Sequence, residues 1–164
     1  FLNLVFTIGL KSCSVQKSKT NKTLKIGTPY QGGILFYLFQ EGDIGYVSGE
    51  LHGLVVAPSD QSSEIEWGCF GTRIKGANKT AVGTGAQNTL AIIASCNETQ
   101  IAAKMCSELV LEGYNDWFLP SKDELNLLYL NKDIITNYGD FYYWSSTGYG
   151  GFNGWGQEFL SGYQ

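Results

Sequence analysis

Residues 113–129, GYNDWFLPSKDELNLLY, carry the clearest structural signal in this sequence. Ser121 can accept a hydrogen bond from the amide of Glu124 while the Glu124 side chain returns to the amide of Ser121, which is a capping box. A short helix is therefore predicted to begin after Ser121 and to run to about Asn131. Its apolar stripe is formed by Leu125, Leu128 and Tyr129.

Two helical segments are expected upstream of this stretch. Residues 87–95 and 99–111 are rich in Ala, Ile and Leu. In the second segment, four apolar residues are spaced to line one face of a helix, namely Ile101, Met105, Leu109 and Leu111. Gly113 follows as a plausible C-cap.

The remaining apolar runs predict strands. Residues 32–38 and 51–57 are joined by a polar segment that contains glycine, which predicts a hairpin. Residues 141–147 are aromatic and then hydroxylated, and 155–160 alternate, so two more strands are expected around a glycine-rich loop at 148–154. The fold class is therefore predicted to be α+β, with a small antiparallel sheet, two to three short helices and long loops.

The chain is long enough for one domain with a real core, and its charge is unevenly distributed. It has 164 residues, of which 43% are hydrophobic, and a formal charge of −4. Five of the eleven basic residues precede Ile26, so six basic and all fifteen acidic residues follow, a formal charge of −9. Such a surface does not attract phosphate backbones, and no nucleic acid is expected as a partner.

The N-terminal segment has the pattern of an export signal. Residues 1–13 contain a short apolar run that ends at Cys13, which resembles the lipobox of a lipoprotein signal peptide. On this interpretation Cys13 is lipidated, residues 14–27 form a flexible tether, and residues 28–164 form the domain. The alternatives are an ordinary secretory signal and a buried strand.

Export would permit disulfide bonds among the other cysteines. Cys96 and Cys106 are close in sequence, so we expect them to pair and Cys69 to be a buried thiol; three buried thiols are the alternative. Zinc is not expected, because the cysteines lack paired spacing and His52 is the only histidine.

Five ordered strings carry a family resemblance. They are YQGGILFYL (30–38), HGLVVAPSDQS (52–62), EWGCFGT (66–72), GYNDWFLPSKDELNLLY (113–129) and YWSST (143–147). The sequence resembles the Lcl C-terminal domain family, the terminal module of a collagen-like bacterial adhesin. The resemblance implies a C-type-lectin-like fold and an exported protein that binds glycans or cell surfaces. It also implies a domain cut short at its last strand, and the collagen-like repeat is missing.

Catalysis is not expected from these residues. Serine hydrolysis needs a base beside the nucleophile, and a glycosidase needs two carboxylates across a cleft. His52 lies in an apolar run, where a hydrogen-bonded core role is favoured. Glu124 is committed to the capping box, and no pair is marked among the other acids.

Aromatic, hydroxyl and amide side chains gather near the C-terminus, a composition that suits glycan recognition. The expected ligand-binding residues are Trp144, Ser145, Thr147, Tyr149, Phe152, Asn153 and Trp155. For Trp144 and Trp155 a core position is the favoured alternative. For the 148–154 loop, a surface turn that binds no ligand is an equal alternative.

Asn115 and Asp116 offer oxygen ligands that suit Ca²⁺. A plain turn before a strand is the favoured interpretation of the same residues. No cofactor is therefore expected, with calcium as the alternative.

These patterns together predict a non-catalytic surface-binding or adhesion domain. Its expected partner is a glycan or a cell-surface protein, and its expected location is extracytoplasmic, on a bacterial cell surface or outer membrane. Membrane contact is expected only through the lipid anchor. The alternative function is a structural or assembly module of a cell-envelope lipoprotein complex.

Overall fold

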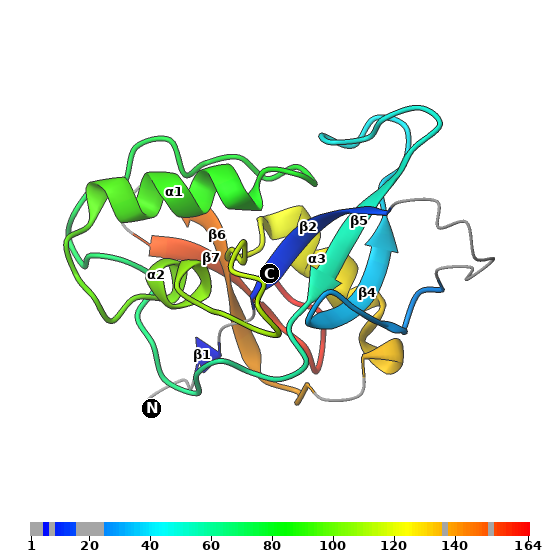
Figure 1. Cartoon of the computed structure of the whole chain (residues 1–164). Coiled ribbons are helices and arrows are strands. Elements are labelled where there is room, and N and C mark those ends of the chain that lie inside the picture. Colours follow the sequence, from blue (N-terminus) through cyan, green and yellow to red (C-terminus); the bar gives the residue numbers. More distant parts are fainter. Residues whose placement is uncertain (1–4, 7–8, 16–24, 136–137, 151–152) are drawn as a thin grey trace.

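The computed structural model describes residues 5–6, 9–15, 25–135, 138–150 and 153–164 (Figure 1). The chain forms a four-stranded sheet and a three-stranded sheet, with α-helices packed against them. The predicted α+β fold class, with short helices and long loops, is confirmed, and the small antiparallel sheet that we predicted is instead two small sheets, one of which includes a parallel pair.

The four-stranded sheet is antiparallel throughout, in the order β2-β5-β4-β3. Its strands are β2 (Leu10–Val15), β5 (Leu51–Val56), β4 (Gly33–Leu38) and β3 (Pro29–Tyr30). The predicted hairpin is present, because β4 and β5 pair from Ile34 opposite Val56 to Leu38 opposite Gly53. Apolar runs in both strands are buried, which fixes their register against the core.

The three-stranded sheet has the order β1-β6-β7. β6 (Tyr142–Tyr149) pairs antiparallel with β7 (Asn153–Glu158), and β1 (Val5–Phe6) lies parallel to β6. The two predicted strands are present, but the connection between them is shorter than the predicted loop at 148–154, because β6 continues to Tyr149 and β7 begins at Asn153. Glycines at 148 and 154 face each other across the ladder and leave room for a ring, described below.

The helices separate two regions of core. α3 (Lys122–Leu130) contacts β6 and β7, and its Leu125 and Leu128 share a cluster with Phe36 of β4 and Tyr143 of β6. This helix therefore joins the two sheets. On the other side of β6, α1 (Gly85–Ser95) packs on α2 (Ala102–Ser107) over a second cluster (Figure 1).

The second predicted helix, 99–111, is shorter than expected. α2 ends at Ser107, and Leu111 instead pairs with Tyr114 through two backbone hydrogen bonds of 3.0 and 2.9 Å. The two residues between them, Glu112 and Gly113, have φ values of 50° and 84°, as a tight hairpin turn requires. Gly113 is therefore a turn residue and not a helix C-cap.

The capping box at the start of α3 is present and does more than the sequence pattern predicts. Glu124 is completely buried and accepts a hydrogen bond from the Ser121 amide at 2.7 Å. Its other carboxylate oxygen accepts from the amide of Gly83 at 2.8 Å, in the segment that leads into α1. Gly85 has no room for a side chain, because a Cβ would overlap this carboxylate. One buried acid thus ties the beginnings of two helices together.

The N-terminal segment is part of the four-stranded sheet. β2 pairs with β5 along its whole length, from Leu10 opposite Val56 to Val15 opposite Leu51. Lys11 is buried in this strand, and its ammonium contacts Asp116. In the uncleaved chain, this segment therefore forms a strand, which was one of the two alternatives to a lipoprotein signal peptide. Cleavage and lipidation at Cys13 stay a prediction.

The segment expected to be a tether, 14–27, is structured where it is described. Its first two residues belong to β2. Most of the remainder, 16–24, lies outside the described residues. At its far end, Gly27 donates a backbone hydrogen bond of 2.8 Å to Leu35, so the chain is already docked on β4 before residue 28.

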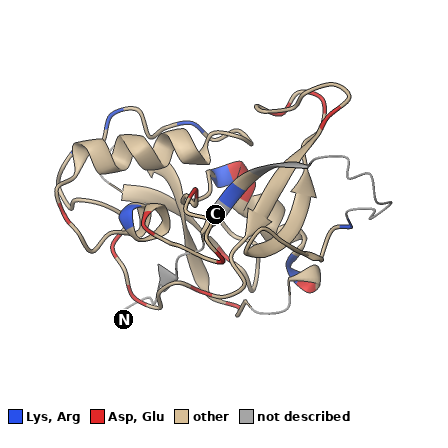
Figure 2. Ribbon diagram, in the orientation of Figure 1, with Lys and Arg blue, Asp and Glu red and all other residues tan. Residues whose placement is uncertain are grey.

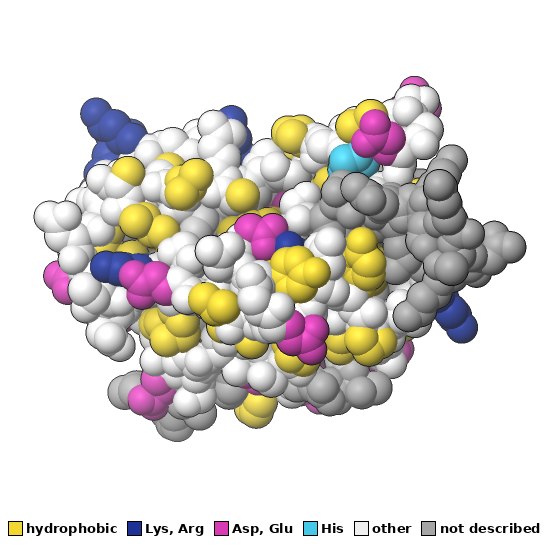
Figure 3. All heavy atoms as spheres, viewed as in Figure 1, with side chains coloured by type: hydrophobic (Ala, Val, Ile, Leu, Met, Phe, Trp, Pro, Cys, Tyr) yellow, Lys and Arg dark blue, Asp and Glu magenta, His cyan; other side chains and the backbone are white. Residues whose placement is uncertain are grey.

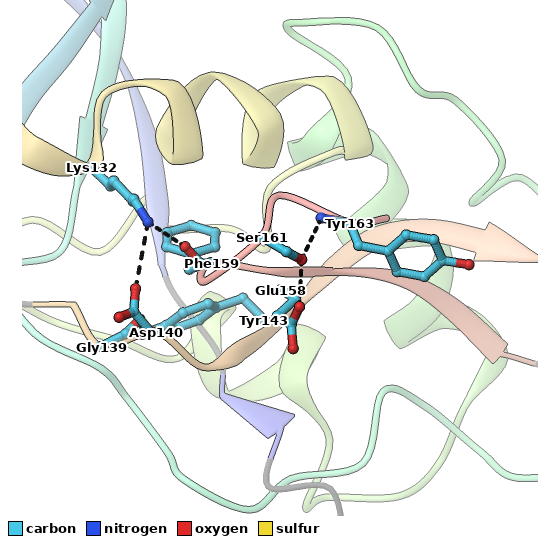
Figure 4. Close-up of polar contacts among 8 residues, drawn as sticks. All are labelled: Lys132, Gly139, Asp140, Tyr143, Glu158, Phe159, Ser161 and Tyr163. Atoms are coloured by element: carbon cyan, nitrogen blue, oxygen red, sulfur yellow. Dashed lines mark hydrogen bonds and ion pairs between the residues drawn. The ribbon is translucent and has the colours of Figure 1, made fainter.

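A polar cluster fixes the C-terminal segment beside β7 (Figure 4). Lys132 contacts the Asp140 carboxylate at 3.4 Å and donates to the backbone carbonyl of Phe159. The Ser161 hydroxyl contacts the Glu158 carboxylate and accepts from the Tyr163 amide at 3.2 Å. The segment after β7 is thereby held against the core.

Among the described residues, none of the helices combines the length and the apolar character needed to span a bilayer.

The buried Glu124 predicts a pH dependence of stability. Burial raises the pKa of Glu124 from 4.5 to about 7, although hydrogen bonds from Ser121, Gly83 and Gly85 act in the opposite direction. Between these values the folded state binds more protons than the unfolded state. The free energy of unfolding contributed by this group is therefore greatest below pH 4.5 and falls by about 3 kcal/mol as the pH rises through 7.

Urea denaturation at about pH 5 and about pH 8, compared between the wild type and Glu124→Gln, measures this contribution. We expect the fall in stability with rising pH to be smaller in Glu124→Gln. Asp123→Gln, an exposed acid of the same helix turn, is the matched control and should keep the wild-type slope. Equal slopes in the wild type and Glu124→Gln would contradict the assignment.

Candidate functional site

A pocket of about 170 Å³ opens beside β6 and the beginning of β7. It is called the aromatic pocket here, and it is lined by Glu66, Trp67, Gly68, Phe70, Trp144 and Asn153. Two of these residues, Trp144 and Asn153, belong to the predicted ligand-binding set. The other four come from the EWGCFGT stretch of the long irregular segment before α1.

The two tryptophans form the buried side of the aromatic pocket. Trp67 is almost fully buried, and its indole nitrogen donates to the backbone carbonyl of Ser145 at 2.8 Å. Trp144 is half-buried, and its indole nitrogen donates to the carbonyl of Ile65 at 2.9 Å. Each indole N–H therefore links β6 to the loop that contains Ile65 and Trp67, and both donors are engaged within the protein.

Glycines of the β6–β7 hairpin make space for Trp67. A Cβ on Gly154 would overlap the indole of Trp67, and a Cβ on Gly148 would lie 3.4 Å from the same ring. The absence of side chains at these positions lets the ring lie close against the hairpin. The glycines thus position the buried wall of the pocket.

A disulfide bond holds the outer wall. Cys69 is bonded to Cys96 at the end of α1, so the predicted Cys96–Cys106 pair is wrong. Cys106 is instead a fully buried thiol on the inner side of α2. Closeness in sequence favoured Cys106, but residues ten apart on two separate elements need not face each other. The loop that crosses from Trp67 to Phe70 brings Cys69 to Cys96.

Phe70 follows this disulfide directly and has 89% of its surface exposed. The disulfide at the preceding residue restricts the backbone on which this large apolar side chain is held. Leaving it in water costs about 2 kcal/mol relative to burial. An exposed ring at the rim of a pocket is typical of a contact residue.

Glu66 is the charged member of the pocket lining. Its backbone carbonyl accepts a hydrogen bond of 2.8 Å from the amide of Ala102, at the beginning of α2, and Glu66 forms a bridge with Ile101. The residue itself is exposed. The backbone is therefore fixed while the carboxylate faces solvent.

The hydroxyl side chains of β6 have a structural role that the sequence did not reveal. Ser145 and Thr147 are each about 1% exposed. Thr147 donates to the carbonyl of Lys79 at 2.8 Å and accepts from the amide of Lys122 at 2.9 Å. The prediction that these two hydroxyls contact a ligand does not fit their burial.

The other predicted aromatic residues form a separate cluster on the same hairpin. Tyr149 is exposed and lies edge-on to Trp155, with 4.8 Å between ring centroids. The Lys122 ammonium lies 4.1 Å from the centroid of the Trp155 ring. Neither ring lines the aromatic pocket, and Phe152 lies outside the described residues. The single predicted surface is thus divided in two.

At the residues considered for calcium, the ammonium group of Lys11 already contacts the Asp116 carboxylate. Both carboxylate oxygens of Asp116 accept from the Lys11 ammonium, at 2.5 and 2.7 Å, and the same ammonium lies 4.4 Å from the Tyr114 ring centroid. Asn115 is exposed beside it. No cluster of three metal-ligating acids, histidines or cysteines occurs within the described part of the chain.

Two carboxylic acids have raised pKa values, and neither lines the aromatic pocket. Burial raises the pKa of Glu124 to about 7 and that of Asp60 to about 6, where a hydrogen bond with Tyr143 opposes the increase. Burial also raises the pKa of Tyr138, whose hydroxyl donates to the Ala57 carbonyl. His52 is half-buried and contacts the Glu50 carboxylate at 2.9 Å. None of these groups is among the residues that line the aromatic pocket.

The surface is mixed in charge and in polarity. Acidic and basic residues are both spread over several loops and elements around the molecule (Figure 2). On the face shown in Figure 3, hydrophobic side chains form separate spots instead of one continuous patch. On this face, a small, local site is therefore a better fit than a broad apolar interface.

The sequence missed Glu66, Trp67 and Phe70 as site residues. Two signals pointed to them: a glycine-flanked Trp and Phe around a cysteine, and an irregular segment of 61–86 that is too long for a simple connection. Neither signal shows that the segment returns to β6.

Comparison with known proteins identifies no relative. No family model matches the chain, and no curated protein or solved structure matches it. A functional assignment therefore depends on the geometry of the aromatic pocket.

The disulfide predicts how the free energy of unfolding changes when the bond is reduced. It closes a loop across a sequence separation of 27, which corresponds to about 3.5 kcal/mol of stability in the chain-entropy account. We expect the double variant Cys69→Ser, Cys96→Ser to lose about this much free energy of unfolding. Reducing agent should have the same effect on the wild type and little on the double variant.

Peptide mapping without reduction tests the pairing directly. The expected product joins the peptides that contain Cys69 and Cys96, and Cys106→Ala should leave it unchanged. A cross-linked peptide that contains Cys106 would overturn the assignment.

Proposed function

We propose that this chain is a non-catalytic, extracytoplasmic binding domain of a bacterial surface protein. The proposed role is recognition of a glycan through the aromatic pocket. The single observation that carries the proposal is the set of ring surfaces from Trp144 and Phe70 beside the polar side chains of Glu66 and Asn153.

The chemistry of the pocket supports a sugar ligand. Aromatic faces stack on the C–H faces of sugar rings, and carboxylate or amide groups bond to sugar hydroxyls. A volume of about 170 Å³ lies below the roughly 300–1,000 Å³ typical of drug-sized ligands, so the pocket suits one terminal unit of a chain.

Removal of the Phe70 ring tests the pocket. We expect Phe70→Ala to weaken glycan binding about tenfold with little change in stability, because the ring is exposed and contributes mainly to contact. A glycan array with the complete protein identifies a ligand, and titration calorimetry measures the loss. Tyr163→Ala, an exposed ring near the C-terminus and outside the pocket lining, is the matched control.

Tyr149→Ala separates the pocket from the Tyr149–Trp155 cluster. Loss of binding in Tyr149→Ala with normal binding in Phe70→Ala would place the ligand on the hairpin instead. A single stoichiometric protein captured from membranes through Phe70, without any glycan binding, would favour the assembly-module alternative.

The proposed location is supported by the disulfide bond and by the lipobox-like segment. Disulfides persist in oxidising compartments such as the bacterial periplasm and cell surface. Lipidation of Cys13 would place the domain on a membrane surface through its N-terminus.

Processing at Cys13 has a structural consequence that can be measured. Cleavage would remove Lys11 and with it the contact to Asp116. We expect mass spectrometry of the membrane fraction to find a lipidated Cys13 as the first residue, and Cys13→Ala to abolish this species. A retained upstream segment, together with a loss of stability in Lys11→Met, would show that β2 is permanent and would contradict the proposal.

A further inference from the structure

The charge of the aromatic pocket restricts its ligand further. Glu66 is the only charged side chain among the six lining residues that the structure describes. Arg73 and Lys75 follow Phe70 in sequence, but neither lines the pocket. A carboxylate without a lining cation favours a positively charged ligand group.

The indole N–H groups of the two lining tryptophans are not available to a ligand. The Nε1 atoms of Trp67 and Trp144 already donate to the carbonyls of Ser145 and Ile65 at 2.8 and 2.9 Å. The face of an aromatic ring carries partial negative charge, which attracts cations. Phe70 at the rim adds a third ring that is free to contact a ligand.

Long-range electrostatics act in the same direction. The whole chain has a formal charge of −4, so cations are weakly drawn toward it. A carboxylate beside aromatic faces is also the usual arrangement for recognising alkylammonium groups. A volume of about 170 Å³ suits such a group and its immediate substituents.

The geometry points to an alkylammonium group as the moiety that this pocket selects, carried by an amino sugar with a free amine or by a quaternary ammonium head group. This inference rests on the proposed binding function of the same pocket and adds the charge of the ligand to it. Glu66 would provide the counter-charge, while Trp144 and Phe70 would contact the substituents.

The experiment uses three probes at about pH 6, where the sugar amines are charged. They are a glucosamine trisaccharide with free amines, its fully N-acetylated counterpart, and tetramethylammonium. Tryptophan fluorescence and calorimetry with the complete protein measure binding. We expect the free-amine sugar to bind about tenfold more tightly than the acetylated sugar.

Charge removal at Glu66 should abolish this preference. Glu66→Gln is expected to bind both sugars at the level of the acetylated one in the wild type. Glu64→Gln, an exposed acid two residues away that does not line the pocket, should behave as the wild type. Because Glu66 is exposed and its backbone makes the structural bonds, the fold should be retained in both variants.

The outcomes separate this inference from the proposed function. Binding of tetramethylammonium without either sugar would support the ammonium inference and assign it to a quaternary head group. Equal binding of both sugars, unaffected by Glu66→Gln but weakened by Phe70→Ala, would overturn the inference and leave glycan binding in place. No binding of any probe or of any array glycan would overturn both.

Discussion

Glu124 is a carboxylic acid with no exposed surface, and the positions of two helices depend on it. Its two oxygens accept from backbone amides at Ser121 and Gly83, so the beginning of α3 and the approach to α1 are joined at one point. Burial of an acid is costly, and here donors from two chain segments offset the cost. Any movement of one segment would leave these groups without partners.

Hydrogen bonds also connect the beginnings of these two helices to β6. Ser146 donates to the Pro120 carbonyl at 3.1 Å, and Thr147 links Lys79 to Lys122. β6 in turn holds the loop of the aromatic pocket through the indoles of Trp67 and Trp144. The pocket is thus built on a continuous set of buried polar contacts, and the disulfide closes the side that these contacts do not reach. Such support keeps a site in one geometry in the absence of ligand.

Local patterns predicted local structure well. The capping box, the β4–β5 hairpin and the α+β class follow from spacing within a few residues, and all are present. The contact between Glu124 and Gly83, 41 residues apart, has no local signal. The cysteine pairing was wrong for the same reason, because sequence distance does not report the direction in which a side chain points. C-type-lectin-like topology remains a proposal.

The sequence predicted some of the residues that line the aromatic pocket and missed others. Trp144 and Asn153 were identified from their chemistry, but the same reasoning selected Ser145 and Thr147, which are buried. A hydroxyl in a strand serves equally well as a ligand contact or as an internal bond, and only the partner distinguishes them. Glu66, Trp67 and Phe70 were missed because the fold, and not the sequence, brings their segment to β6.

The pairing of β2 with β5 has a consequence for assembly. β5 is buried along Leu54, Val55 and Val56, and β2 is the strand that satisfies its outer row of backbone amides and carbonyls opposite these residues. A chain that began at Cys13 would keep only half of that cover. The uncovered half of β5 would then be an open sheet edge, on which a strand from another molecule can be added by the same ladder of hydrogen bonds.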